Sequence, residues 1–505
     1  MPETYLHGVE VVEVDDGPRS IRTVRSSVIG VVGTAPDSQA EVKAKLTTGL
    51  AVSNNALVWT SKLTGALGNS VSVTIADPKA NNSALAVSVS GTDITVRAAT
   101  GANGAITTTA TQLIAAITAN SEASRLVTVA NAEGSAGTGT IVAGRRAVLA
   151  DGVDEAFPLN TPVLVAGDTT LVAQLGKNGT LPKAFDGIFD QTGAVVIVVR
   201  VGQGQTDADS MTNVIGGIDV ATGKYTGVHA LLGSASVTGF TPKILIAPGF
   251  THQRENNLAN PVVAEMQGVA ERLRAVIVKD GPNTTDADAI KDRGDWGSAR
   301  IFLVDPFVLV RNDLGEVEAR PASDRVAGLV AKMDNDKGFW HSPSNQIING
   351  IIGTARAIDF VLGDANSRAN LLNEQDVATI IREDGFRLWG NRTCSSDPKW
   401  SFVSVRRTAD MINESILKAH MWAVDRNITK TYFEDVAQGV NDYIAGLVIQ
   451  GALLGGKCYP TPGLNSIANV MQGKAFWDFD FTPPFPAEHL TFRSKLVGDY
   501  IEEIL

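Results

Sequence analysis

The sequence predicts a protein of several domains: an α/β domain in the middle, an α+β domain at the C-terminal end and a small, mostly β domain inserted near the N-terminus. Short apolar runs alternate with amphipathic stretches after Pro158, as strands and helices do in a layered sheet. The composition changes abruptly between about Ser38 and Glu155. The length of 505 residues is enough for about three or four domains of ordinary size.

The stretch from Ser38 to Glu155 differs from the rest of the chain in its side chains. It holds eight basic and eight acidic residues, and Trp59 is its only aromatic residue. A core almost free of aromatic rings has to be built from Val, Ile, Leu and Ala, so we expect it to form separately from the remainder. Leu113 and Ile117 are spaced as on one face of a helix. The predicted elements are strands over residues 56–61, 71–75, 85–90, 94–96 and 127–130 and a helix over residues 109–120.

The middle of the chain contains four short runs that are rich in Val, Ile and Leu. Such runs are typical of strands that are covered on both faces, and turn residues follow each of them. A helix is predicted over Pro261–Leu273, because Val262, Met266 and Val269 fall on one side of it. We expect a layered sheet with at least some parallel pairing, formed by strands over Ala194–Val201, Lys243–Ala247, Arg274–Val278 and Arg300–Val304.

The chain after about Leu371 has an α+β pattern. Asp384 and Gly385 lie between two β-prone runs, and this pair suits the turn of a hairpin formed by residues 378–383 and 386–389. The other predicted elements are a strand over Trp400–Val405, helices over Ala409–Asn427 and Tyr432–Leu454, and a terminal strand in which Leu490, Phe492 and Leu496 share one face.

Charge, cysteine content and hydropathy exclude several classes of protein. The 43 basic and 54 acidic residues give a net charge of −11, which argues against binding of nucleic acid or anionic lipid through the overall field. The two cysteines, Cys394 and Cys458, cannot form a disulfide framework or a structural zinc site. No apolar run approaches the roughly 20 residues of a membrane helix, and the N-terminus lacks the features of a secretory signal. We therefore expect a soluble cytosolic product.

Several short motifs come close to chemical sites without meeting their requirements. Residues 451–458 approach a phosphate-binding loop, but Cys458 stands where Ser or Thr is needed, and we expect a glycine-rich helix terminus. Asp334 and Asp336 suggest a calcium loop that no glutamate closes, and we expect a solvated turn. The six histidines form no ligand pair, and Cys394 is expected to be a structural thiol. The sequence therefore predicts no catalytic residue, no metal ligand and no cofactor.

Several long, non-repetitive sequence segments are similar to those of a known family. They are His7–Val11, Ser26–Gly30, Ile301–Pro306, Gly338–Gly350, Phe386–Thr393, Arg406–Ile412 and Phe479–Phe492. In these segments the chain resembles the contractile tail sheath proteins of bacteriophages with myovirus-type tails and of phage-tail-like particles. The likeness covers residues 1–35 and about 158–505, whereas the stretch from 38 to 155 lies outside it.

The resemblance implies a structural and mechanical function without enzymatic activity. Sheath subunits of this family stack as hexameric rings around a rigid tube, and the sheath collapses to a shorter, wider helix that drives the tube through the host cell envelope. The implied fold is an α/β sheath core domain and an α+β C-terminal domain completed by the N-terminal segment. The expected domains are 1–37 as an N-terminal arm with strands that join the C-terminal domain, 38–156 as an insert on the outer surface, 157–370 as the middle α/β domain, and 371–505 as the tube-facing C-terminal domain with its terminal arm.

The resemblance also implies partners and a location. The expected partners are further copies of this chain, a tail tube protein, and baseplate and tail terminator proteins, with no nucleic acid and no membrane insertion. The expected location is the virion, after assembly in the host cytoplasm.

Two sets of residues are candidates for assembly. Both ends of the chain are β-prone, and the resemblance implies extended arms that pair with strands of neighbouring subunits. The expected strand-exchange residues are Val9, Val11, Val14, Ile21, Leu490, Phe492, Leu496 and Ile501. A helix of the C-terminal domain is implied to face the tube, and Lys418, Arg426 and Lys430 are candidates for pairing with an acidic tube surface.

Other functions stay open at this point. The first is the sheath of a phage-tail-like bacteriocin or another contractile injection particle, because the mechanical parts are shared. An α/β enzyme is suggested by the strand–helix alternation alone. A receptor-binding or carbohydrate-binding particle component is suggested by the β-rich insert, although Trp59 alone offers little for a glycan.

Overall fold

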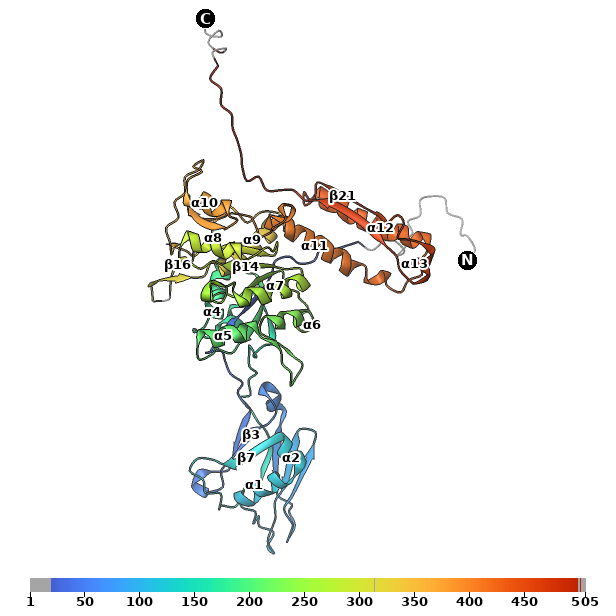
Figure 1. Ribbon diagram of the computed structural model, residues 1–505. Coiled ribbons are helices and arrows are strands. Elements are labelled where there is room, and N and C mark those ends of the chain that lie inside the picture. Colours follow the sequence, from blue (N-terminus) through green and yellow to red (C-terminus); the bar gives the residue numbers. More distant parts are fainter. Residues whose placement is uncertain (1–19, 313, 498–499, 501–505) are drawn as a thin grey trace, which may run out of the picture. The chain divides into compact units, whose positions relative to one another are not determined.

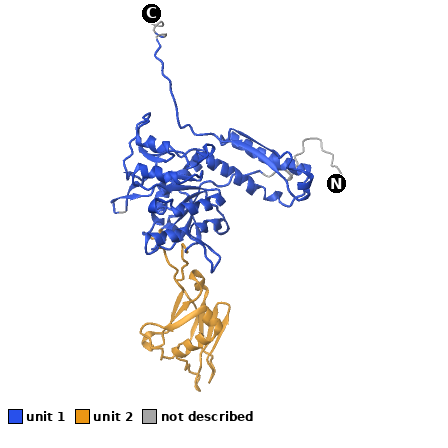
Figure 2. Ribbon diagram, in the orientation of Figure 1, with its two compact units in different colours: residues 1–36, 159–172, 177–505 blue, residues 37–158, 173–176 orange. Residues whose placement is uncertain are grey.

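The computed structural model describes residues 20–312, 314–497 and 500, and it divides into two compact units (Figure 2). Unit 2 comprises Asp37–Pro158 together with Ala173–Gly176, and unit 1 comprises the rest of the described chain. The predicted insert, residues 38–156, lies within unit 2. Among the described residues, no helix is long and apolar enough to span a membrane.

Unit 1 is built around a six-stranded sheet with the order β15-β14-β13-β1-β10-β9. Five of its strands run parallel to one another, and β9 is antiparallel to β10. The four strands predicted in the middle of the chain are β10, β13, β14 and β15, so their parallel pairing is confirmed. The strands are β1 Val28–Thr34, β9 Pro162–Ala166, β10 Val195–Val201, β13 Ile244–Ile246, β14 Val276–Asp280 and β15 Ile301–Val304.

The first strand, β1, lies in the middle of this sheet, between β10 and β13. All seven of its residues are buried. A strand that is apolar on both faces has to lie inside a covered parallel sheet, which accounts for its central position. The expectation that the strands of residues 1–37 join the C-terminal domain is therefore wrong for β1.

Helices cover both faces of the sheet. Apolar side chains of α5 and α7 pack with alternate residues of β1 and β10, and α4 and α9 contact β1 from the other side. The predicted helix over Pro261–Leu273 is confirmed as α7, and the Asn260 side chain caps it by accepting a hydrogen bond from the Val263 N–H. The helices of this part are α3 Thr169–Ala173, α4 Leu181–Phe189, α5 Asp207–Ile215, α6 Ser234–Thr238, α7 Pro261–Leu273, α8 Asp286–Gly294 and α9 Ser323–Asp336.

Smaller sheets surround this core. The predicted hairpin is confirmed as β19 and β20, and both Asp384 (φ 47°) and Gly385 (φ 110°) have the positive φ that such a turn requires. The hairpin is fastened to the large sheet, because the Ala378 N–H donates to the Leu303 carbonyl at 3.0 Å. The elements are β11 Gly217–Ile218, β12 Tyr225–Thr226, β16 Val308–Arg311, β17 Val317–Arg320, β18 Gly353–Thr354, α10 Arg368–Glu374, β19 Thr379–Arg382 and β20 Phe386–Trp389.

The C-terminal part contains two long helices and a two-stranded sheet (Figure 1). The strand predicted over Trp400–Val405 is wrong, because Pro398–Trp400 form a 3-10 turn and a helix begins at Val403. Apolar and polar residues alternate locally, but Arg406 pairs with Asp410 one helical turn later at 2.8 Å, and nearly all residues of that turn are buried. The elements are α11 Val403–Ala419, α12 Lys430–Ile449, β21 Gly455–Pro460, α13 Ile467–Met471 and β22 Trp477–Thr482.

Buried ion pairs join α11 to the large sheet. The Arg300 guanidinium, just before β15, makes two hydrogen bonds to the Asp410 carboxylate at 2.6 and 3.1 Å. Lys243, just before β13, lies 3.0 Å from the carboxylate of Glu414. Burial alone would raise the pKa of Glu414, but the hydrogen bond from Lys418 and the charge of Lys243 outweigh it and lower that pKa. We call these contacts the ion-pair seam.

A third pair of the ion-pair seam corrects a prediction. Asp334 does not lie in a solvated turn but in the last turn of α9, where its buried carboxylate accepts a hydrogen bond from Arg407 Nη1 at 2.6 Å. Arg407 Nη2 also donates to the Ser26 carbonyl at 3.1 Å. The ion-pair seam therefore also holds the chain just before β1.

Unit 2 has its own core, and it contains the five predicted strands and the predicted helix together with β2, α2 and β8, which were not predicted. Trp59, Leu113 and Ile117 are buried within one apolar cluster. Thr109 caps α1 through a capping box with Gln112. The elements are β2 Lys45–Thr48, β3 Leu57–Ser61, β4 Ser72–Ala76, β5 Ala86–Ser90, β6 Asp93–Arg97, α1 Ala110–Ala119, α2 Ser121–Leu126, β7 Val127–Asn131 and β8 Gly144–Val148.

The two ends of unit 2 lie side by side. Val42 and Val153 exchange both main-chain hydrogen bonds, each at 2.9 Å. A short linker can therefore replace this unit without a large gap to close.

We predict that a chain in which residues 38–156 are replaced by a short Gly/Ser linker keeps the fold of the remainder, because each unit has a separate apolar core. The check is a cooperative thermal transition by circular dichroism with a Tm close to that of unit 1 in the full chain. Residues 37–158 expressed alone, as the matched control, should also fold. A remainder that does not fold would show that the insert belongs to its core.

We also predict that Asp410→Asn lowers the free energy of unfolding by about 3 kcal/mol, because it removes the buried carboxylate from the Arg300 guanidinium and leaves it only the largely exposed carboxylate of Glu271, 2.8 Å away. The measurement is urea denaturation. Glu434→Gln is the matched control in the same unit, since the Lys430–Glu434 pair is exposed and should be worth less than about 1 kcal/mol. Equal, small losses in both variants would contradict a structural role for the ion-pair seam.

Candidate assembly interface

The N-terminal segment packs against its own chain at Ile21, Thr23 and Val24. The Thr23 hydroxyl lies 2.9 Å from the Tyr443 hydroxyl on α12, and the Val24 N–H donates to Ser415 Oγ on α11 at 3.0 Å. Ile21 and Val24 pack against the apolar cluster of α11 and α12. The candidate Ile21 thus packs, partly buried, within its own chain, whereas Val9, Val11 and Val14 lie outside the described residues.

The C-terminal segment behaves differently. After β22, residues 483–497 form neither helix nor strand, and Figure 1 draws them as a single extended trace. The side chains of Leu490, Phe492 and Leu496 are 71 %, 93 % and 105 % exposed. The predicted terminal strand therefore has no ladder partner within the described part of its own chain, and Ile501 lies outside that part.

The two-stranded sheet β21–β22 packs one face on α12. Trp477, Phe479 and Phe481 alternate with exposed residues along β22 and contact the apolar cluster of α11 and α12. A sheet of two strands is marginal by itself, so this packing supplies much of its stability.

The two edges of this sheet differ. The side chain of Asn441, on α12, accepts a hydrogen bond from the N–H of Cys458 on β21 at 2.7 Å and donates one to the Cys458 carbonyl at 2.9 Å. The N–H and the carbonyl of Cys458 thus point to the outer edge of β21, away from Phe479, which lies opposite Cys458 on β22. In an antiparallel pair of this type, Phe479 also turns its main-chain groups outward, toward the other edge. The β21 edge is therefore closed at its middle by Asn441, and the β22 edge is the one that suits an added strand.

The three basic candidates lie around the junction of α11 and α12, and each has a partner in its own chain. Lys418 pairs with Glu414 at 2.9 Å and Lys430 pairs with Glu434 at 3.7 Å. The Arg426 guanidinium lies over the ring of Trp422, 4.8 Å from its centre. The structure brings the three residues to one region, but part of their charge is balanced locally.

The residues that sequence motifs singled out lie in the core or at the end of a helix. Cys394 is buried, and burial raises the pKa of its thiol to about 12, so no thiolate is available as a nucleophile. Gly451 follows the end of α12 with a φ of 79°, as a helix-terminating glycine does, and the next residues form β21 rather than a phosphate loop. Within the described ranges, no group of three or more His, Cys, Asp or Glu is arranged to hold a metal ion.

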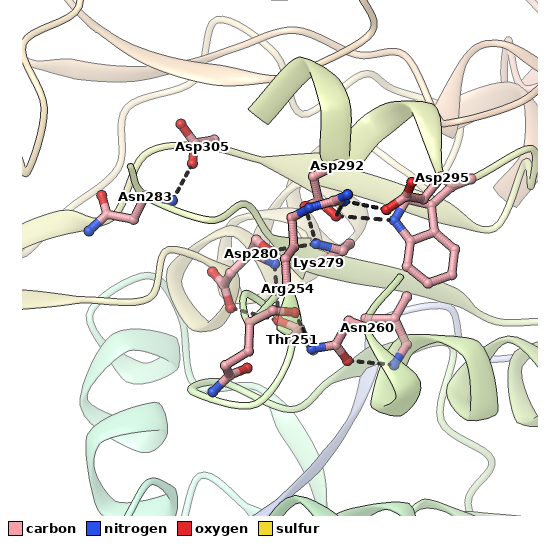
Figure 3. A network of polar contacts seen from close by, with 12 residues as sticks. Thr251, Arg254, Asn260, Lys279, Asp280, Asn283, Asp292, Asp295 and Asp305 are labelled. Atoms are coloured by element: carbon pink, nitrogen blue, oxygen red, sulfur yellow. Dashed lines mark hydrogen bonds and ion pairs between the residues drawn. The ribbon is translucent and has the colours of Figure 1, made fainter. Parts of the chain in front are cut away.

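A network of charged side chains fills the carboxyl ends of β13 and β14, where many α/β sheets bind ligands (Figure 3). Asp280 is fully buried, and its carboxylate accepts hydrogen bonds from the Ser323 N–H at 2.8 Å, Ser323 Oγ at 2.6 Å and Thr251 Oγ1 at 3.2 Å. Lys279 pairs with Asp292, which also accepts a hydrogen bond from Arg254 at 3.0 Å. Burial raises the pKa of Asp280 despite these donors. The chain's own side chains therefore occupy this position and tie the loops together.

The ion-pair seam and this network were missed by sequence reasoning. One signal was visible in the sequence: Arg406, Arg407 and Asp410 are spaced as neighbours on a helix, within a segment that carries the family resemblance. Their partners Arg300 and Asp334 lie 110 and 73 residues away, and the sequence around them does not indicate the pairing.

Sequence models of phage tail sheath domains match three parts of the chain. The phage tail sheath protein central domain matches residues 223–394, the phage tail sheath C-terminal domain matches residues 395–496, and the tail sheath protein Gp18 domain III N-terminal region matches residues 139–201. The division at 394 and 395 differs from the expected one at 370 and 371. It agrees with the attachment of β19 and of Cys394 to the large sheet, since the Cys394 N–H donates to the Ile301 carbonyl at 2.9 Å.

The matches to curated relatives span most of the length of each relative. A prophage major tail sheath protein of Pseudomonas aeruginosa (strain UCBPP-PA14) is 42 % identical over 71 % of this chain and 91 % of that protein. The tail sheath protein of Escherichia phage P2 is 33 % identical over 72 % of this chain and 92 % of its own. The tail sheath protein of Burkholderia phage BcepMu is 30 % identical over 99 % of this chain and 98 % of its own.

Solved structures show the same fold. A chain of the helical sheath of the anti-feeding prophage in the contracted state has a TM-score of 0.53 at 19 % identity, over 67 % of this chain and 88 % of that one. A chain of the PVC sheath complex of an extracellular contractile injection system has a TM-score of 0.52 at 16 % identity, over 68 % of this chain and 89 % of that one. With the matched domains and with relatives that share 30 to 42 % of their residues over nearly their whole length, this chain belongs to the contractile bacteriophage tail sheath proteins.

Proposed function

We propose that copies of this chain polymerise as stacked hexameric rings around a tail tube, and that the sheath contracts to drive the tube through the host cell envelope. One observation carries the proposal: the chain combines an exposed, apolar C-terminal segment with a two-stranded sheet whose β22 edge suits an added strand. Exposed Leu490, Phe492 and Leu496 serve no purpose in a monomer, whereas in a lattice they supply anchors for pairing.

The C-terminal segment of one copy adds to the β22 edge of another. Main-chain hydrogen bonds give this contact its strength without fixing the angle between subunits tightly, so the link can persist while subunits rotate. A free strand edge is normally an aggregation hazard, and here it is the assembly device. Val9, Val11, Val14 and Ile501 stay candidates for the same kind of exchange.

The C-terminal part of unit 1 and unit 2 take different positions in the proposed sheath. The C-terminal part with α11 and α12 faces the tube, and unit 2 lies on the outer surface of the sheath, where its separate core makes it dispensable for the lattice. Two of the relatives match about seven tenths of this chain and the BcepMu protein matches almost all of it, as expected if the insert occurs in some sheath proteins only. The partners are the tail tube, the baseplate and the tail terminator, and assembly takes place in the host cytoplasm.

Contraction needs no fuel in this proposal. The extended sheath is a metastable state, and the free energy released on contraction is stored in the contacts between subunits. The alternative of a tail-like bacteriocin or injection particle uses the same mechanics, and the presence or absence of a genome-filled head on purified particles decides between them. An α/β enzyme has no support from the buried Cys394 thiol or from the filled carboxyl ends of β13 and β14.

We predict that the purified chain forms hollow tubes without a tail tube and that a chain ending at Glu488 does not. The truncated chain should remain a folded monomer with an unchanged Tm, because the removed side chains described here are exposed. Phe492→Pro should also abolish tubes by removing a ladder donor, whereas Phe492→Ala, the matched control, keeps the N–H and should only weaken assembly. Electron microscopy and size-exclusion chromatography are the measurements.

Removal of residues 1–19 tests the other end without disturbing the contacts of Ile21, Thr23 and Val24. We expect folded monomers that do not form tubes. Normal polymers from either truncated chain would contradict strand exchange by that end.

We predict that Lys418→Glu, Arg426→Glu and Lys430→Glu together weaken co-sedimentation with the tail tube several-fold at low salt and spare sheath polymers. The three residues cluster at the junction of α11 and α12, and the effect should fade as the ionic strength rises. Lys79→Glu is the matched control, since Lys79 is an exposed, paired lysine in unit 2. Tube binding that does not change across a salt series would exclude this patch.

A further inference from the structure

The C-terminal segment is stiff where it leaves β22. Thr482 ends the strand, and Pro483, Pro484 and Pro486 follow within the next four residues. Proline fixes φ and has no N–H, so the ladder with β21 cannot continue through these residues. Closely spaced prolines favour an extended chain of about 3.1 Å per residue. The segment therefore leaves the sheet as a short, stiff spacer.

This spacer ends in a set of contacts that we call the arm clasp, formed by Arg392, Phe402, Phe485 and Glu488. Arg392 Nε donates to both carboxylate oxygens of Glu488, at 2.9 and 3.0 Å, and Nη2 donates to Glu488 Oε2 at 2.5 Å. The Phe485 ring meets the Phe402 ring edge-on, with centres 6.0 Å apart. The Arg392 guanidinium also lies over the Phe402 ring at 5.2 Å.

The body of unit 1 holds its half of the arm clasp in place. Arg392 and Phe402 face each other in an isolated antiparallel bridge, so their side chains leave neighbouring points of the main chain. Asp376 lies 3.8 Å from the Arg392 guanidinium on another side. A lone exposed ion pair would count for little, but a forked arginine that is stacked on a ring and flanked by a second carboxylate is restrained in direction.

The contacts of the arm clasp end at Glu488, and the apolar side chains of the arm beyond it are exposed. Leu490, Phe492 and Leu496 remain exposed, so the arm clasp does not shelter apolar residues as an autoinhibitory contact would. It holds only the root of the arm.

We propose that the arm clasp is a positioning contact for assembly, which fixes the point and direction from which the arm, residues 489–497, leaves its own subunit. The inference rests on the proposed pairing of this arm with a neighbouring copy. A strand that departs from a fixed, stiff root has fewer residues to order when it pairs, so the entropy lost on assembly is smaller. Arg392 and Glu488 thus act through the arm and not by contact with the neighbour.

The test compares the full-length chain with Glu488→Gln, which keeps the shape of the side chain and removes its charge. We expect the critical concentration for tube formation, measured by sedimentation, to rise about five- to tenfold, while the Tm of the monomer stays unchanged. Arg392→Gln should raise the critical concentration at least as much, because it removes the other half of the same contact. Asp93→Asn is the matched control, because Arg146 forks onto Asp93 at a half-exposed site of unit 2, and it should assemble as the wild type does.

A second readout separates positioning from general stability. A dye on Thr491→Cys should rotate more freely in the Glu488→Gln background, as measured by time-resolved fluorescence anisotropy of the monomer. An unchanged critical concentration together with unchanged dye motion would overturn the inference, as would a Tm loss that accounts for the weaker assembly. If the chain ending at Glu488 still forms tubes, strand exchange by this arm is wrong; if only Glu488→Gln assembles normally, the positioning role alone is wrong.

Discussion

The ion-pair seam between α11 and the starting ends of β13 and β15 is the interaction on which the rest of unit 1 depends. Arg300 and Lys243 precede the two strands, and Asp410 and Glu414 lie one turn apart on α11. α11 in turn supports α12, and α12 supports both the β21–β22 sheet and the N-terminal segment. Hydrogen-bonded charges have preferred directions, so this contact resists sliding more than apolar packing of the same size would. The β21–β22 sheet and the N-terminal segment are thereby fixed to the large sheet, as the proposed contraction would require of a subunit that transmits force between neighbours.

At the opposite ends of the same strands, charged side chains fill the place where many α/β sheets bind ligands. In enzymes with this kind of sheet, ligands bind where the strands end, in space left by the loops. Here Lys279 and Asp280 fill that space from within, and Asp280 joins the start of α9 to the loop after β13. Each buried charge has a partner of opposite sign or a set of donors, as burial requires. The sheet is thus closed by charged networks at both ends and works as a scaffold, in agreement with the matched sheath family.

The sequence predicted those features whose signal is local. Runs such as Val195–Val201 and the helix Pro261–Leu273 show their burial in their own hydrophobic pattern, whereas β2 and β8 of unit 2, which are largely exposed and lack an apolar run, were not predicted. The start of α11 was missed because its burial and its ion pairs involve partners far along the chain. The anchoring of Ile21 against α11 and α12 was missed for the same reason, since Thr23 and Tyr443 are 420 residues apart in the chain. The partners of Lys418 and Lys430, by contrast, lie one helical turn away and could have been read from the sequence.

The asymmetry of the β21–β22 sheet bears on the form that an assembly can take. Asn441 closes the β21 edge at Cys458, so each copy offers one edge for an added strand near its C-terminus, and it carries one bare arm from that end. If the arm of one copy pairs with the β22 edge of the next, donor and acceptor surfaces differ, and the contact is heterologous. Contacts of this kind close into rings when the rotation per copy allows it and continue as helices when it does not. The proposed sheath of stacked rings on a helical lattice needs such contacts, whereas a two-fold pairing of identical edges would end in a dimer.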